Sequence, residues 1–387
     1  MEVNQSNGPP DPALRRSPRL PRLLAVAAVV VVVIVAGYAT YGFVQEQATA
    51  GEPTLVVYAY SSLLGGCSSA LTQTLFAAFG NAHGVHVELD CPSGTLVSTL
   101  LAERNAPVAD VVIGLDEITG PEAEANGLLV PYASPALTHV NATLAAELSP
   151  DAALTPYEWG YLAFDYKPSF DAETGGAVGT ANFSAFAANT TWASNLIVED
   201  PTVDITGEEF LLWEIAYYTT VLHGDWTSFW RAIDPYVTVA PDWSTAFGDY
   251  AASAGSPGVV VSYSTDPAYA AGTGAPGTIN ATVSWNGSTG YGWRTVYGLG
   301  IVNGSRQTAL DRAFVDWFLS SQVQYQIPAN EWEYPANDTT PLPTSFQYAV
   351  NPLTIVPLND AVGPSTIVAS LPGWLETWQT IANAPGG

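Results

Sequence analysis

The order of apolar and polar positions after residue 53 alternates strand-like runs with helix-like stretches. The β-branched run TLVVYAY (54–60) predicts a strand, and residues 69–84 have the three-to-four-residue apolar spacing of a helix. Segments 85–91 and 109–116 predict two more strands, with a helix between them over 93–107. Strands and helices alternating at this short spacing predict βαβ units and a parallel sheet. Ligands of such sheets gather at the carboxyl ends of the strands.

A second α/β set follows in the middle of the chain. Its expected elements are strands at 159–166, 194–200, 235–240 and 258–264, and helices at 208–224 and near 243–254. A strand at 297–304 and an amphipathic helix over 307–327 return the chain to the first set. We therefore predict two α/β lobes with a ligand cleft between them. The expected parts are lobe 1 at 54–158 and 296–350, lobe 2 at 159–295, and a C-terminal segment at 351–387.

The N-terminal region has the features of a membrane anchor. Residues 23–43 form an uncharged stretch of 21 residues, which as a helix spans about 31 Å, the thickness of a bilayer core. Four arginines precede it, so the positive-inside rule places residues 1–22 in the cytoplasm. We predict a single-pass cell-membrane protein whose C-terminal part is extracytoplasmic, with a linker at 44–53. A cleaved signal peptide is the alternative, although its apolar region would be unusually long.

Two further features agree with export. Cys67 and Cys91 are the two cysteines of the chain, and such a pair in an exported protein predicts a disulfide. Seven N-x-S/T sequons suggest surface glycosylation; they are at Asn141, Asn182, Asn189, Asn280, Asn286, Asn303 and Asn337.

The charge of the chain is strongly negative. The 10 basic and 36 acidic residues give a net charge of −26, and after residue 43 six basic residues face 34 acidic ones. Such a field excludes nucleic acid as a partner and attracts cations. A saline or acidic habitat, or solubility alone, would also explain this composition. The hydrophobic share of 48% is enough for two globular units with real cores.

Catalytic signatures are absent from the sequence. There is no G-x-S-x-G, H-E-x-x-H, P-loop or dinucleotide fingerprint, so we expect a protein that is not an enzyme and has no cofactor. The acidic pair Glu208–Glu209 opens a helix, where such pairs usually compensate the helix dipole. Asp116 and Glu117 form a second pair at a strand end.

Aromatic residues stand out at loop positions and strand ends. Trp243 follows Pro-Asp, Tyr263 and Tyr269 lie in SYSTDPAY, and Trp332 lies in NEWEYP with Tyr334. A flat cation held between such faces gains roughly 0.5–2 kcal/mol per cation–π contact. These residues are therefore candidates for binding an organic cation, although any one of them could instead cap the core.

At these segments the chain resembles the thiamine-binding substrate-binding proteins of ABC transporters. The resemblance runs from about residue 54 to 350 and depends on stretches in a fixed order, among them VVYAYSS, ADVVIGLD, EWGYLAFDY, EDPTVDITGEEFLLW, PDWSTAFGDY and ANEWEYP. These proteins are part of the wider type II periplasmic-binding-protein family, which includes ferric-iron and polyamine binders. The resemblance implies a two-lobe α/β fold that closes over thiamine or its phosphates. It also implies a monomer that delivers its ligand to an ABC permease.

The resemblance also implies ligand contacts. Tyr60, Trp243, Tyr263, Tyr269 and Trp332 occupy the family's contact positions, for ring stacking and for hydrogen bonds from tyrosine hydroxyls. The chain departs from the pattern at Ser93, where the family has an acid, near Cys67, where a tryptophan is lost, and at Asp204, where the family has a serine. We hypothesise that Asp116 or Asp204 supplies the missing carboxylate.

Other ligands stay open at this point. Scarce basic residues and the Glu208–Glu209 pair favour free thiamine over its diphosphate. Tyr217–Tyr218 is a tyrosine pair of the kind found in ferric binders, but it lies in an apolar helix where a core position is expected. A polyamine would also suit acids and aromatic rings. A glycosylated surface-layer or adhesion protein is the non-transport alternative, and it would show β-sandwich alternation instead.

Overall fold

The computed structural model describes residues 53–252 and 255–383. The predicted basic segment at 1–22, the predicted anchor at 23–43 and all but the last residue of the predicted linker lie outside the described residues. Within the described ranges, no helix combines the length and the apolar character that crossing a membrane requires.

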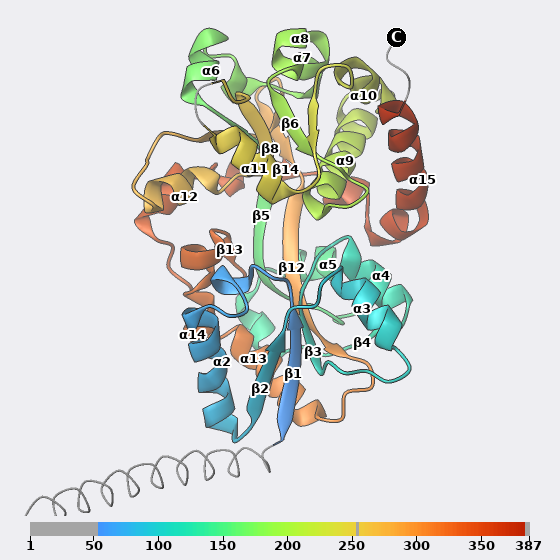
Figure 1. Cartoon of the computed structure of the whole chain (residues 1–387), viewed down its shortest axis with the longest axis vertical. Coiled ribbons are helices and arrows are strands. Elements are labelled where there is room, and N and C mark those ends of the chain that lie inside the picture. Colours follow the sequence, from blue (N-terminus) through green and yellow to red (C-terminus); the bar gives the residue numbers. More distant parts are fainter. Residues whose placement is uncertain (1–52, 253–254, 384–387) are drawn as a thin grey trace, which may run out of the picture. The chain divides into compact units, whose positions relative to one another are not determined.

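The first half of the sheet is built from three parallel strands that follow the predicted order. Strand β1 (Thr54–Ala59) lies between β2 (His86–Asp90) and β3 (Val111–Leu115) and is parallel to both. Figure 1 shows these strands beside helices α2 (Ala70–His83) and α3 (Leu96–Glu103) in the lower part of the molecule. The predicted βαβ units are thereby confirmed.

Local side chains set the ends of these two helices. Ser69 Oγ accepts the backbone N–H of Thr72 at 3.1 Å and so caps α2. Gly84 ends α2 with a φ of 63°, a conformation that glycine adopts without steric cost. Helix α3 begins later than the predicted residue 93, because Thr95 is its N-cap and accepts the N–H of Ser98.

The second half of the sheet mixes parallel and antiparallel pairs. Strand β6 (Leu196–Glu199) is parallel to β7 (Thr238–Ala240) and to β8 (Val259–Tyr263), and β8 is antiparallel to β5 (Thr155–Tyr166). Helices α9 (Ile205–Ala216) and α11 (Trp243–Ala251) pack on this half.

Two long antiparallel strands run through both halves. Strand β12 (Arg294–Val302) pairs with β3 and with the first part of β5, while the second part of β5 pairs with β8 and β9. The strand order is β2-β1-β3-β12-β5-β8-β6-β7. In Figure 1, β5 and β12 connect the lower half of the molecule with the upper half. The predicted lobe boundaries, between 158 and 159 and between 295 and 296, fall within these strands.

Smaller elements complete the fold. The remaining α-helices and strands are α4 (Thr119–Ala125), β4 (Leu129–Val130), α5 (Ala142–Leu148), α6 (Pro168–Glu173), α7 (Phe183–Ala188), α8 (Thr190–Ala193), α10 (Thr227–Ile233), α12 (Asp266–Gly272), β9 (Asn280–Thr282), β10 (Ser284–Asn286), β11 (Thr289–Gly292), α13 (Thr308–Phe318), α14 (Ser321–Gln324), β13 (Tyr334–Pro335), β14 (Ile355–Pro357) and α15 (Pro364–Ala382). Short 3-10 and π-helical turns lie at Leu63–Gly65, Pro135–His139, Val178–Thr180, Tyr217–Val221, Ile327–Glu331, Thr344–Tyr348, Pro352–Thr354 and Asn359–Ala361.

Two predicted helices differ from the observed ones. The single helix expected over 307–327 is wrong, because Ser320 adopts an extended conformation (ψ 158°) and separates α13 from α14. The helix expected over 208–224 begins earlier, at Ile205, and ends as a π-helical turn at Tyr217–Val221.

The core of the second half is aromatic. Tyr217 and Tyr218 belong to it, with exposed fractions of 0% and 7%, and the Tyr217 hydroxyl donates to the carbonyl of Trp285 at 2.8 Å. The core position expected for this tyrosine pair is confirmed. The pair is therefore not available as the iron ligands that the ferric alternative would need.

The structure bears on two predictions that were linked to export, the disulfide and the surface sequons. Cys67 and Cys91 form the predicted disulfide. The prediction of seven surface sequons is wrong at Asn337, whose side chain is buried and donates through Nδ2 to the carbonyl of Leu319 at 2.9 Å. Glycosylation of the other six asparagines stays a prediction.

Candidate ligand-binding cleft

A row of aromatic rings follows one side of the cleft. Trp243, the first residue of α11, has its ring centroid 6.3 Å from that of Tyr263 at the end of β8 and 5.2 Å from that of Phe247. Phe247 lies 6.3 Å from Tyr269 of α12, which lies 5.4 Å from Trp332. All five rings are half-buried. The structure therefore brings four predicted ligand contacts into one continuous row.

Polar side chains behind the row fix the Trp243 indole. Its Nε1 donates a hydrogen bond to Ser262 Oγ at 2.9 Å, and Ser262 Oγ donates to Asp266 Oδ2. Asp242 caps α11 by accepting the N–H of Thr245 at 2.8 Å, which sets where the helix begins. The ring is thus anchored through its nitrogen edge, and its backbone is anchored by the helix cap.

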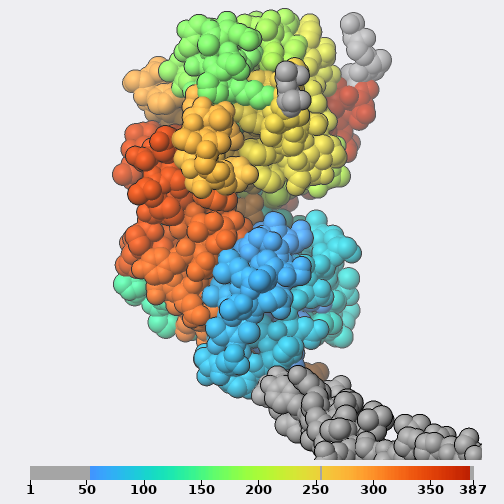
Figure 2. All heavy atoms as spheres, turned by 60° about the vertical axis from the view of Figure 1, so that its left-hand side comes forward, coloured from blue at the N-terminus to red at the C-terminus, as the bar shows by residue number. Residues whose placement is uncertain are grey.

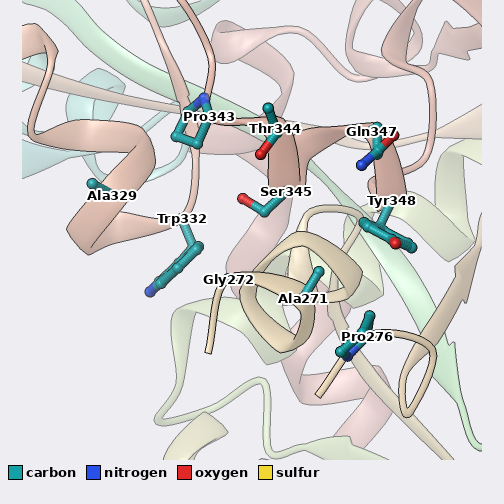
Figure 3. A pocket seen from close by; sticks show the side chains of 10 residues that line it. All are labelled: Ala271, Gly272, Pro276, Ala329, Trp332, Pro343, Thr344, Ser345, Gln347 and Tyr348. Atoms are coloured by element: carbon teal, nitrogen blue, oxygen red, sulfur yellow. The ribbon is translucent and has the colours of Figure 1, made fainter. Parts of the chain in front are cut away.

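Trp332 has an unusual backbone. Its φ of 61° is left-handed, a conformation that costs a bulky residue of order 1 kcal/mol or more and tends to occur at functional sites. The indole packs so closely on α12 that a Cβ at Gly272 would overlap it. A cavity of about 440 Å³ lies beside this ring, and Figure 3 shows Trp332 at its edge, together with Ser345 and Gln347.

Tyr60 faces the row from the other half of the sheet. It follows β1, and its hydroxyl lies 3.1 Å from Glu331 Oε2, 3.3 Å from Glu158 Oε1 and 3.3 Å from the Tyr157 hydroxyl. Burial, and then the charge of Glu158, raises the pKa of Tyr60 well above its ordinary value. Tyr60 therefore remains a neutral hydroxyl that can donate and accept.

Tyr297 of β12 connects Tyr60 with the row. Its ring centroid lies 6.3 Å from that of Tyr60. Burial, and then the neighbouring Tyr263, raises the pKa of Tyr297 well above its ordinary value. The Tyr263 hydroxyl in turn lies 3.2 Å from Thr206 Oγ1 of α9. Figure 2 shows the surface hollowed between the blue segment that carries Tyr60 and the yellow segment that carries Trp243.

The two predicted aspartates accept backbone N–H groups at the beginnings of helices, and Asp204 is the N-cap of α9. Asp116 is 3% exposed, and its Oδ1 accepts the N–H groups of Ile118 at 2.9 Å and Thr119 at 2.7 Å. Asp204 Oδ1 accepts the N–H of Thr206 at 3.0 Å, and its Oδ2 accepts the N–H of Trp243 at 3.3 Å. Asp204 therefore holds the beginning of α11 against α9.

Ser93 lies apart from this arrangement. It is exposed in the loop before α3, and among the described residues no hydrogen bond joins it to another predicted contact.

Three buried glutamates and one half-buried glutamate at the cleft were not predicted as site residues. Glu158, Glu209 and Glu333 are 3%, 0% and 7% exposed, and Glu331 is half-buried beside Tyr60. Burial raises the pKa of Glu331 to about 7. Burial also raises the pKa of Glu208, which precedes Glu209 on α9, to about 8. Glu331 and Glu333 flank Trp332 in the sequence, and this spacing was the available signal for them. Tyr297 and Phe247 were also missed.

Within residues 53–252 and 255–383, no group of three or more His, Cys, Asp or Glu side chains is placed to hold a metal ion.

Strands β5 and β12 run through both halves of the sheet, and the aromatic row and Tyr60 lie on different halves. This arrangement is that of a periplasmic-binding-protein fold. Comparison with known proteins agrees. The thiamine-binding periplasmic protein of Escherichia coli (strain K12) is 26% identical over 329 residues, which cover 85% of this chain and 93% of that protein. The resemblance predicted from the sequence is thereby confirmed, although no protein-family model matches the chain.

Solved structures share the fold. A periplasmic thiamin binding protein superposes with a TM-score of 0.69 at 24% identity, over 86% of this chain and 97% of its own. Iron-bound HitA from Pseudomonas aeruginosa superposes with a TM-score of 0.63 at 16% identity, over 85% of this chain and 99% of its own. The mixed α/β periplasmic-binding-protein fold expected from the sequence is confirmed by these superpositions.

Proposed function

We propose that this chain is an extracytoplasmic solute-binding protein that captures thiamine for an ABC importer. The observation that carries the proposal is the row of five half-buried rings from Tyr263 to Trp332. Beside Tyr263, Thr265 donates a hydrogen bond to the buried carboxyl of Glu333. The similarity to thiamine-binding periplasmic proteins supports the same ligand.

The chemistry of the cleft suits an organic cation with two flat rings. The faces of Trp243 and Trp332 offer π-surfaces to a positively charged ring, each contact contributing roughly 0.5–2 kcal/mol. The carboxyl groups accept hydrogen bonds from an aminopyrimidine. The hydroxyls of Tyr60 and Tyr263 can donate hydrogen bonds to polar substituents, because burial raises the pKa of both tyrosines and keeps the hydroxyls protonated.

Free thiamine fits this site better than its diphosphate. A diphosphate would need basic side chains or free backbone N–H groups. Arg294, on a strand that crosses between the halves, is already paired with Glu147 at 2.8 Å. The N–H groups at the beginning of α9 are capped by Asp204.

The sequence also suggests how the binding unit is attached to the membrane and how its two lobes move. An anchor over 23–43 would tether the unit to the cell membrane with a cytoplasmic N-terminus, and a tether raises its effective concentration at the permease. We expect a monomer, since one copy of the chain supplies both sides of the cleft. The two predicted lobes would close over the ligand by a hinge motion. One lobe is formed by 54–158 with 296–350 and the other by 159–295. Capture and delivery require no catalysis, and the similar proteins are binding proteins.

The proposal is tested by ligand competition. Residues 54–387 form one compact unit, and its tryptophan fluorescence is titrated with thiamine, thiamine phosphates, spermidine and ferric citrate. We expect saturable quenching by thiamine, weaker binding as phosphates are added, and no displacement by ferric citrate. Saturation by spermidine or ferric citrate with no response to thiamine would contradict the proposal.

A further inference from the structure

Glu209 of α9 is a buried carboxyl without a counter-charge. Its exposed fraction is 0%, and neither carboxylate oxygen has a hydrogen-bond partner among the described residues. Burying a carboxyl in this way is costly unless it is protonated or a cation is supplied. A group of this kind needs a physical explanation.

The position of Glu209 on α9 directs it toward the cleft. Residues three apart on a helix share one face, and Thr206, three residues earlier, contacts the Tyr263 hydroxyl at 3.2 Å. Tyr263 is one end of the aromatic row. The helix therefore presents Glu209 on the same side as the rings of the proposed ligand site.

Glu333 supplies a second such group. Its Oε1 accepts a hydrogen bond from Thr265 Oγ1 at 3.2 Å, whereas no described residue contacts its Oε2 with a hydrogen bond. Its side chain is 7% exposed and packs over Gly160 of β5 so closely that a Cβ there would overlap it. The carboxyl is thus held between Gly160 of β5 and Thr265, which follows Tyr263 by two residues.

We propose that Glu209, supported by Glu333, provides the counter-charge that makes the cleft select a permanently cationic ring over a neutral ring of the same shape. This inference rests on the proposed function, and it names the residues that determine charge specificity. The rings provide stacking for both kinds of ligand, and the carboxylates discriminate between them.

The electrostatic surroundings of Glu209 support this role. The groups that face it are themselves acidic or neutral: Asp116, Glu117, Asp204, Glu333, Tyr263 and Tyr297. Burial, and then the charges of Glu117 and Asp116, raises the pKa of Glu209 well above its ordinary value. Burial without a partner thus favours the protonated form of this carboxyl in the free protein. A bound cation would favour its ionised form, so that binding would release a proton.

A matched control lies on the same helix. Glu214, five residues later, is also 0% exposed with both oxygens unpaired within the described part of the chain. It lies near Tyr218 in the aromatic core. Glu214→Gln therefore repeats the loss of a buried carboxyl without touching the proposed ligand site.

The experiment compares two probes on the same proteins. Thiamine and an analogue with an uncharged thiophene in place of the thiazolium are titrated by calorimetry into the wild type, Glu209→Gln, Glu333→Gln and Glu214→Gln. We expect the wild type to prefer thiamine at least about 10-fold, Glu209→Gln to reduce that ratio by about 10-fold, and Glu333→Gln to reduce it less. Glu214→Gln is expected to keep the wild-type ratio. In buffers of different ionisation enthalpy, Glu209→Gln is expected to release fewer protons on binding thiamine.

The outcomes separate the two proposals. If Glu209→Gln and Glu333→Gln fold and bind thiamine with the wild-type ratio and proton release, the counter-charge inference is overturned while the proposed function stands. If the wild type binds neither probe, the proposed function fails and the inference fails with it. Melting curves of each variant show which proteins are folded, and Glu333→Gln keeps the inference testable should Glu209→Gln not fold.

Discussion

The indole nitrogen of Trp243 donates a hydrogen bond to Ser262 Oγ at 2.9 Å, and this bond ties the aromatic row to the end of β8. Ser262 is 0% exposed and donates in turn to Asp266. The orientation of the ring proposed to stack on the ligand therefore depends on a buried serine that lies behind it.

Ser262→Ala is expected to weaken thiamine binding. The substitution leaves the Trp243 N–H and the Asp266 carboxyl without their shared partner, which costs roughly 1–3 kcal/mol and releases the ring from its fixed orientation. Thiamine affinity measured by calorimetry should fall by about 10-fold. Thr282→Val is the matched control, because Thr282 Oγ1 accepts a similar bond from Trp285 Nε1 at 2.9 Å on an indole that is not part of the row. Equal loss of affinity in both variants would contradict a specific role for Ser262.

Arg294→Gln is expected to destabilise the fold strongly. Arg294 lies on β12, donates through Nη1 to both oxygens of Glu147 at 2.9 and 2.8 Å, and donates to the Tyr161 hydroxyl. The paired side chains are 12% and 7% exposed, and breaking such a buried pair costs about 3 kcal/mol. Arg231→Gln breaks an exposed pair with Asp225, at 62% and 63% exposure, and should cost less than about 1 kcal/mol. Urea denaturation of both variants measures the difference.

Removing the disulfide is expected to lower stability without abolishing the fold. The bond closes a loop between cysteines separated by 24 residues, which corresponds to about 3 kcal/mol in the chain-entropy description. Both sulfur atoms also lie 3.5 Å from the carbonyl of Tyr60, so the bond supports one wall of the cleft. The double variant Cys67→Ser/Cys91→Ser should therefore show a lower midpoint of denaturation and weaker thiamine binding. Unchanged values on both measurements would contradict this account.

The stability of the unit is expected to be highest in acid. Burial raises the pKa of Glu331 from 4.5 to about 7, and that of Glu117 and Glu208 from 4.5 to about 8. The folded state therefore binds protons that the unfolded state has already lost, so this stabilisation is complete below pH 4.5 and is lost as the pH rises through 7 and 8. The melting temperature should fall as the pH rises from 4.5 to about 8, and Glu331→Gln should make the fall shallower between pH 4.5 and about 7. A melting temperature that rises over this range would refute the assignment.

Sequence patterns predicted the eight strands of the main sheet because these are mostly β-branched runs between turn residues, as in TLVVYAY and GVVVSYS. They missed the short strands β4, β9, β10, β11, β13 and β14. They failed at 307–327, where apolar spacing continues through Ser320 although the backbone turns there. The aromatic row could be anticipated because several aromatic residues lie at loop positions and strand ends, where not all of them can be core. Their contact with a ligand stays a prediction. Asp116 was proposed from its place at a strand end and Asp204 from its departure from the family serine. Nothing in the sequence shows that both carboxylates accept backbone N–H groups at the start of a helix. The buried glutamates were missed for a related reason, since Glu209 looks like an ordinary helix-start acid until its burial is known.

The most direct test of the central claim is a calorimetric titration of residues 54–387 with thiamine, for the wild type and for Trp243→Ala. The account predicts one site per chain, binding at submicromolar concentration in the wild type, and a loss of affinity of at least about 100-fold in the variant. Wild-type protein that is folded and releases no heat with thiamine, or a variant that binds as the wild type does, would contradict the account.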